Sequence, residues 1–188
     1  MPKLIVFNSV SLDGYFTDAK NDMSWAHRGQ GDPEWNEFVA GNAKGGGRLL
    51  FGRKTYEMMA SFWPTPMAQR SLPLVAERMN AASKVVFSRT LKDARWNNTR
   101  LVTRGLVAEV TKMKESPGTD MVILGSGEIV AQLASEGLVD EYQFVIIPIA
   151  LGKGRTLFDG MKKRLDLRLV RSRSFKIGNM LVCYEPAP

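Results

Sequence analysis

Residues 121–132 read Met121-Val122-Ile123-Leu124-Gly125-Ser126-Gly127-Glu128-Ile129-Val130-Ala131-Gln132. An apolar run is followed by a turn of small residues and then by a helix-like stretch. A strand that ends at such a turn leaves the first N–H groups of the next helix free at the sheet edge. Those groups and the helix dipole favour a phosphate. Turns of this kind also occur as plain connections, so the stretch alone predicts a strand–turn–helix unit.

A second glycine turn, Phe51-Gly52-Arg53-Lys54-Thr55, has the same layout earlier in the chain. The Arg53 guanidinium suits a phosphate and the Thr55 hydroxyl can donate to one. The alternative for Arg53 is a solvated arginine at a helix N-terminus. Two such turns at one edge of a sheet would hold the two ends of a long anionic cofactor.

Strands and helices alternate from residue 48 to residue 136. We expect strands at 48–51, 84–87, 100–103 and 121–124, and helices at 55–62, 74–79, 106–113 and 128–135. This alternation implies right-handed crossovers and a mainly parallel sheet.

The flanking segments complete the predicted fold. Residues 3–10 form a first strand, residues 11–32 a long loop, and Asp32-Pro33 opens a helix. Residues 141–149 form a long strand. Strands over 165–175 and 176–185, joined by a Gly-Asn turn, form an antiparallel hairpin. We expect one α/β domain over residues 1–188.

Composition limits the classes of protein. The chain has 188 residues, of which 44% are hydrophobic and 24% charged, as in a soluble globular protein. No apolar run approaches the roughly 18 residues of a membrane span. The N-terminus reads as a strand and not as a signal peptide. Cys183, the single cysteine, is expected to be a buried inert thiol. We expect a cytoplasmic protein that binds no metal.

The net charge is +7, from 26 Lys and Arg against 19 Asp and Glu. The basic residues are scattered and match no nucleic-acid-binding motif. The hypothesis of a nucleic-acid-binding protein rests on the charge alone. It would require an affinity for DNA or RNA that depends steeply on salt. A small polyanionic ligand is the better match.

Five motifs follow one another along the chain. They are Ser9-Val10-Ser11-Leu12-Asp13-Gly14-Tyr15, Phe51-Gly52-Arg53-Lys54-Thr55-Tyr56-Glu57, Val86-Phe87-Ser88-Arg89, Val122-Ile123-Leu124-Gly125-Ser126-Gly127, and Gly137-Leu138-Val139-Asp140-Glu141 running on to Leu151-Gly152-Lys153-Gly154-Arg155-Thr156-Leu157-Phe158. In this order they resemble the dihydrofolate-reductase-like superfamily, and most of all its bacterial branch that shares the reductase domain of riboflavin-biosynthesis deaminase-reductases. The resemblance spans essentially the whole chain. It implies a three-layer fold of that superfamily.

The resemblance also implies NADPH as the cofactor. It places Gly52, Arg53, Lys54 and Thr55 at the pyrophosphate and adenosine side. Ser88 and Arg89 would lie by the 2′-phosphate. The turn from Gly125 through Ser126, Gly127, Glu128 and Ile129 to Val130 would carry the central phosphates and the nicotinamide side. The absence of a Rossmann-type glycine fingerprint disfavours a Rossmann dehydrogenase.

Substrate contacts and a proton donor are the remaining expectations. Dihydrofolate reductases place an acid on the first helix, and the corresponding position here falls near Asn36 or Glu37. Asn36 carries no acid, and the other interpretation of Glu37 is an exposed helix carboxylate. Asp13 is the second acid, and its other interpretation is an Asp-Gly turn residue. The predicted substrate contacts are Asn8, Asp13, Trp35 and Thr156. Trp35 also reads as core, and Thr156 as an ordinary strand residue.

The resemblance therefore implies an NADPH-dependent reductase that transfers a hydride to a small heterocyclic or ribosyl-amine substrate, similar either to the riboflavin-pathway reductases or to dihydrofolate reductases. The alternative is a non-catalytic nucleotide-binding module that retains the cofactor edge. The oligomeric state stays open. A homodimer that pairs or packs through residues 141–149 is one arrangement.

Overall fold

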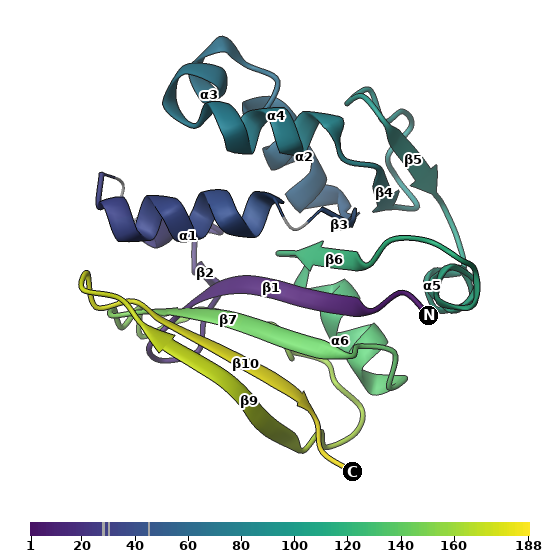
Figure 1. The fold of residues 1–188 in the computed structure, drawn as a ribbon. Coiled ribbons are helices and arrows are strands. Elements are labelled where there is room, and N and C mark those ends of the chain that lie inside the picture. The colour runs from purple at the N-terminus through teal and green to yellow at the C-terminus, as the bar shows by residue number, and fades with distance from the viewer. Residues whose placement is uncertain (28, 30, 45) are drawn as a thin grey trace.

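The computed structural model describes residues 1–27, 29, 31–44 and 46–188. Its centre is an eight-stranded sheet with the order β5-β4-β3-β6-β1-β7-β10-β9 (Figure 1). These strands are β1 (Leu4–Ser11), β3 (Arg48–Gly52), β4 (Lys84–Phe87), β5 (Thr99–Val102), β6 (Met121–Leu124), β7 (Glu141–Ile147), β9 (Leu167–Ser174) and β10 (Met180–Pro186).

The strands from β5 to β7 in that order all run parallel. β10 is antiparallel to β7, and β9 is antiparallel to β10. The predicted parallel sheet with a C-terminal antiparallel hairpin is confirmed. The hairpin turn falls between Ser174 and Met180, as the Gly-Asn signal indicated.

Helices cover both faces of the sheet. The helices are α1 (Pro33–Lys44), α2 (Arg53–Phe62), α3 (Pro66–Ser71), α4 (Pro73–Ala81), α5 (Leu106–Glu115) and α6 (Gly127–Ser135). Alternate residues of β6 separate the two layers. Val122 and Leu124 pack with residues of α2 and α4, while Met121 and Ile123 pack with residues of α5 and α6. Helix α1 covers β7 and β10 on the α2 side. The predicted three-layer fold is confirmed.

Four short elements were not predicted. Helix α3 follows Thr65, whose side chain accepts a hydrogen bond from Ala68 N, with Pro66 at the first helical position. A Thr-Pro pair is a helix start signal, but the neighbouring prolines were interpreted as a break. In the predicted loop 11–32, β2 (Thr17–Asp18) pairs with β8 (Gly154–Arg155), and Ser24–His27 form a 3-10 turn.

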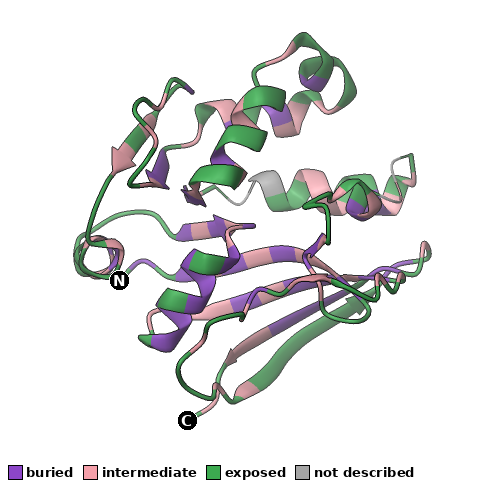
Figure 2. Ribbon diagram, turned by 180° about the vertical axis from the view of Figure 1, so that it is seen from behind, coloured by how far each residue is buried: buried purple, intermediate pink, exposed green. Residues whose placement is uncertain are grey.

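Strand β7 lies inside the sheet, because β1 and β10 flank it. Pairing across a dimer through residues 141–149 was therefore a wrong expectation, since no edge of β7 is free. The edge strands of this sheet are β5 and β9, and β9 is exposed along most of its length (Figure 2). Its register with β10 shifts between Cys183 and Tyr184, where Val170 is the extra residue of a bulge, and Leu169 and Val170 are both exposed.

None of the helices in the described parts of the chain is long and apolar enough to span a membrane.

Candidate functional site

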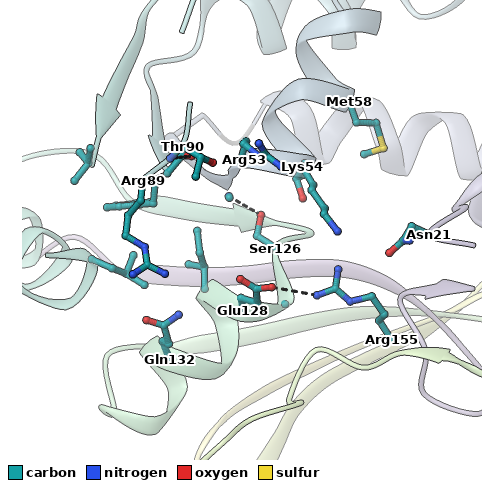
Figure 3. A pocket seen from close by; sticks show the side chains of 18 of the residues that line it. Asn21, Arg53, Lys54, Met58, Arg89, Thr90, Ser126, Glu128, Gln132 and Arg155 are labelled. Carbon is teal, nitrogen blue, oxygen red and sulfur yellow. Dashed lines mark hydrogen bonds and ion pairs between the residues drawn. The ribbon is translucent and has the colours of Figure 1, made fainter. Parts of the chain in front are cut away.

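A cleft of about 840 Å³ lies across the carboxyl ends of β5, β4, β3 and β6. Parallel α/β sheets bind ligands at this edge, because the loops there connect strand ends to helix beginnings. The opposite wall comes from β2, β8 and the segment after β2 (Figure 3). The lining residues are Phe16, Thr17, Asn21, Met23, Gly52, Arg53, Lys54, Thr55, Met58, Phe87, Ser88, Arg89, Thr90, Val102, Thr103, Arg104, Gly105, Leu106, Ser126, Gly127, Glu128, Ile129, Gln132 and Arg155.

Three helices begin at this cleft. The residues that precede them are Gly52 for α2, Gly105 for α5 and Ser126 for α6, and all three line the cleft. None of the three helices has a capping side chain that accepts a hydrogen bond from its first turn. First-turn N–H groups without a cap need another acceptor, and an anion is the one that the helix dipole favours.

The two predicted glycine turns touch each other. Gly52 N donates to Ser126 Oγ at 2.9 Å, and Ser126 Oγ donates to Leu124 O at 3.1 Å. The expectation that both turns lie at one sheet edge is therefore confirmed. Gly125 has a φ of +57°, and a β-carbon there would lie 2.8 Å from Thr55 Oγ1. The first obstacle to a side chain at residue 125 is thus the neighbouring turn.

The cleft is strongly basic. Five cationic side chains line it, and Glu128 is the one acid among the described lining residues. The cations are Arg53, Lys54, Arg89, Arg104 and Arg155. Arg155 pairs with Glu128, and within the described residues the other four have no carboxylate within 4.0 Å. In Figure 3, Lys54, Arg89 and Arg155 reach into the space from different elements. Such a cluster favours a ligand with several negative charges.

The opposite wall mixes apolar and polar groups. Phe16 packs against the start of α6, since a β-carbon on Gly127 would lie 3.0 Å from its ring. The Thr17 hydroxyl is buried and has no hydrogen-bond partner among the described residues. Met23 and Asn21 complete this side of the lining.

Most of the predicted cofactor residues meet in the cleft. Those that line it are Gly52, Arg53, Lys54, Thr55, Ser88, Arg89, Ser126, Gly127, Glu128 and Ile129. Gly125 and Val130 are not among the lining residues, and Val130 lies on the fully buried, core-facing side of α6. The Ser88 hydroxyl accepts from Thr90 N and Leu91 N, so it also shapes its own turn.

The predicted substrate contacts lie outside the lining. Asn8 is buried, and its amide donates to Gly125 O at 3.4 Å. Trp35 is buried in an aromatic cluster with Phe38 and Phe175, on the face of β7 that α1 covers. Thr156 is exposed. Asn8 therefore contacts the glycine turn through a buried hydrogen bond to its backbone. Trp35 has the surroundings of a core residue.

The two predicted acids also lie outside the lining. Asp13 accepts hydrogen bonds from Ser11 Oγ at 2.6 Å, Gly152 N at 2.7 Å and Leu151 N at 3.0 Å. These donors, the Ser11 hydroxyl first, lower the pKa of Asp13 from 3.8 to about 2. The contacts are those of a turn residue that stays ionised. Glu37 is exposed on α1.

Sequence reasoning missed Arg104, Gln132, Asn21, Thr17 and Arg155. A signal for Arg104 was present, because Thr103-Arg104-Gly105 joins a strand to a helix as the two glycine turns do. The pairing of β2 with β8 places Arg155 at the cleft, and no local sequence pattern predicts that pairing.

No group of three or more His, Cys, Asp or Glu side chains that could hold a metal ion occurs among the residues that the structure describes.

The protein is an α/β protein with a dihydrofolate-reductase-like fold, and three helices begin at its basic cleft. Residues 2–181 match the model of the RibD C-terminal domain. The chain belongs to that family, as its motifs indicated. A similar curated protein is the uncharacterized protein YyaP of Bacillus subtilis (strain 168). It is 27% identical over 185 residues, which are 97% of this chain and 94% of that protein.

Solved structures show the same fold. A putative riboflavin biosynthesis protein from Shewanella sp. PV-4 has a TM-score of 0.74 at 22% identity, with 99% of both chains covered. A deaminase/5-amino-6-(5-phosphoribosylamino)uracil reductase from Thermotoga maritima has a TM-score of 0.67 at 14% identity. The match covers 99% of this chain and 57% of the Thermotoga chain. Dihydrofolate reductase from Enterococcus faecalis, complexed with NADP(H), has a TM-score of 0.61 at 15% identity, with 99% and 97% covered.

Proposed function

We propose that this protein is an NADPH-dependent reductase that transfers a hydride to a small heterocyclic or ribosyl-amine substrate. One observation carries the proposal: three helices without capping side chains begin at one cleft that five cations line. Family membership and the NADP(H) named with the dihydrofolate reductase neighbour support the same cofactor.

The residues present fit NADPH, which carries a pyrophosphate and a 2′-phosphate. Arg89 and Arg104 follow β4 and β5 at the outer end of the cleft and would hold the 2′-phosphate. The starts of α2 and α6, with Arg53 and Thr55, would hold the pyrophosphate. When bound, the cofactor supplies the hydride.

The chain itself contributes orientation and charge. Gly52 and Ser126 fix the two turns against each other through their hydrogen bond, so both helix ends face one ligand. The Asn8 amide donates a hydrogen bond to Gly125 O and so helps to fix the position of this turn. A fixed site of this kind accelerates a transfer by positioning the reacting groups.

The proton for such a reduction comes from solvent water in this proposal. Asp13 is ionised near neutral pH because its pKa lies at about 2, so it has no proton to give. Glu37 lies outside the lining. Glu128 is largely exposed at the solvent side of the cleft. We therefore expect weak or absent turnover of dihydrofolate, whose protonation by dihydrofolate reductases uses an acid on the first helix.

The wall around Asn21 suits a small polar ring. Met23 and Met58 provide apolar contact, the Asn21 amide can donate and accept, and Lys54 and Arg155 add positive charge. Figure 3 shows Lys54, Asn21 and Arg155 reaching toward a common space. The Thermotoga neighbour is named as a reductase of a phosphoribosylamino-uracil, which has these features.

Calorimetry with NADPH and NADH tests the cofactor assignment. The unmodified protein should bind NADPH more tightly, and Arg89→Ala should weaken NADPH about 10- to 100-fold if the guanidinium makes a charge-assisted phosphate bond. NADH should change little. Arg95→Ala is the matched control, because Arg95 pairs with Asp93 and does not line the cleft. Equal affinity for both nucleotides, or no effect of Arg89→Ala, would contradict the assignment.

Steady-state NADPH oxidation separates the reductase from the non-catalytic module, since both bind the cofactor. A ribosylamino-pyrimidine should be a better oxidant of NADPH than dihydrofolate. Robust dihydrofolate turnover that is lost in Glu37→Gln would show that α1 supplies an acid after all.

A further inference from the structure

One ion pair spans the two walls of the cleft. Arg155 Nη2 lies 3.5 Å from Glu128 Oε1, and the two residues come from β8 and from the first turn of α6 (Figure 3). The Glu128 carboxylate is 85% exposed and the Arg155 side chain 39% exposed, so the pair lies at the solvent side of the cleft.

The position of Arg155 is fixed by its surroundings, while that of Glu128 is not. Arg155 pairs with Thr17 across the β2–β8 ribbon, and its backbone accepts a hydrogen bond from Phe16 N at 2.9 Å. Its guanidinium lies 5.9 Å from the centre of the Phe16 ring, which packs against Gly127. Glu128 has Arg155 as its one side-chain partner among the described residues. A ligand can therefore displace the carboxylate without moving the arginine.

Glu128 occupies two positions that an anionic ligand would use. It neutralises one of the five cations of the cleft, and it lies in the first turn of α6, where the helix dipole favours negative charge. A ligand phosphate at that helix end would meet the like charge of Glu128 and would find Arg155 already paired.

We propose that Glu128 is a built-in counter-anion, which pairs with Arg155 and is displaced from it by a phosphate group of the ligand. The inference rests on the proposed function, because it requires a phosphate-bearing ligand in the cleft. Its consequence is that the chain lowers its own affinity for that ligand. Faster release of a bound nucleotide follows from the weaker binding.

The test is a double-mutant cycle measured by calorimetry with NADPH and, separately, with inorganic pyrophosphate. Glu128→Gln should tighten both about two- to fivefold, the range expected when an exposed ion pair no longer competes. The gain should be smaller when Arg155 is also replaced, because only the like charge of Glu128 then acts on the phosphate. Arg155→Gln and Arg155→Ala give two versions of that background, each checked by its thermal melt.

Glu109→Gln is the matched control. Glu109 also lies in the first turn of a helix that begins at the cleft, and it also pairs with an arginine, Arg100 at 2.6 Å. Neither residue of that pair lines the cleft. Glu109→Gln removes the same charge and should leave both affinities unchanged.

Each outcome decides the matter. Unchanged or weaker binding in Glu128→Gln overturns the inference, and so does an equal gain with and without Arg155, which would show a general charge effect. If NADPH fails to bind the unmodified protein but pyrophosphate binds, the proposed function fails and the pyrophosphate cycle alone decides. If neither binds to any variant, both proposals fail.

Discussion

Two successive residues at the end of β6 hold left-handed backbone conformations, Gly125 with φ +57° and Ser126 with φ +62°. Serine rarely adopts this conformation, because its β-carbon approaches the following carbonyl oxygen. The Ser126 hydroxyl bonds to Gly52 N and Leu124 O, and these bonds offset part of that cost. The backbone strain of Ser126 therefore lies where the two glycine turns contact each other and helix α6 begins.

Gly125→Ala should destabilise the protein more than its backbone conformation alone explains. The left-handed conformation costs about 1–2 kcal/mol for alanine. In addition, the new methyl group would lie 2.8 Å from Thr55 Oγ1. Urea unfolding measures the sum.

Gly160→Ala is the control for this prediction, since Gly160 has φ +83° with nothing within 4 Å of a β-carbon. It should show the conformational cost only. The excess in Gly125→Ala should disappear when Thr55→Ala is added. A persistent excess would mean that the obstacle is not Thr55.

Asp13 predicts a pH effect on stability. Its pKa is about 2 in the folded protein against an ordinary value of 3.8. The unfolded chain thus takes up the proton first as the pH falls, so the carboxylate stabilises the fold above about pH 4 and loses that effect toward pH 2. Asp13→Asn should melt at a lower temperature than the unmodified protein at pH 7, and the gap should close as the pH approaches 2.

The exposed Asp159 offers a comparison, because none of the hydrogen bonds or ion pairs of the described residues involves it. Asp159→Asn should melt with the unmodified protein throughout. A gap for Asp13→Asn that stays constant from pH 7 to pH 2 would show that loop geometry, and not charge, sets its contribution.

At the scale of elements, one buried lysine joins three segments around β4. Lys84 is 1% exposed, and its Nζ donates to Asn80 O at 3.1 Å, Ala82 O at 2.7 Å and Asn97 O at 3.0 Å. It also lies 4.4 Å from the centre of the Trp96 ring. Burial lowers the pKa of Lys84 to about 8, while the carbonyls and the ring favour the ammonium form. The side chain therefore stays charged at pH 7.

Lys84→Met should cost about 2–4 kcal/mol of unfolding free energy, because carbonyls at the end of α4 and before β5 lose their donor. Denaturant unfolding at pH 7 measures this, with the exposed Lys92→Met as a control that should stay within about 0.5 kcal/mol. An unchanged midpoint for Lys84→Met would mean that water replaces the ammonium without loss.

The elements differ in how far their sequence determines them. The strands from β3 to β6 carry short apolar runs bounded by turn residues, and their pairing follows from alternation with helices. Strand β9 was predicted as a strand, but its burial was not predictable, because the bulge in its pairing with β10 breaks the alternation at Val170. The β2–β8 ribbon depends on residues far apart in the chain, so local patterns carry no trace of it.

At the scale of the whole molecule, the sequence predicted one wall of the cleft better than the other. Gly52, Arg53, Ser126 and Gly127 sit in strand–turn–helix units, whose direction relative to a parallel sheet is fixed. The opposite wall is assembled from the segment after β1 and from β8, and their approach is a property of the folded chain. Arg155 joins Arg89 and Arg104 in the cleft only through this assembly, because it lies on β8.

The central place of β1 bears on how the chain is made. Leu4 pairs with Met121, and Ile5 pairs with Glu141, so both neighbours of β1 lie more than a hundred residues later in the sequence. During translation at about 5–20 residues per second, this apolar strand waits on the order of ten seconds with both edges unpaired. Nascent β1 is therefore a long apolar segment on which a holding chaperone at the ribosome has time to act.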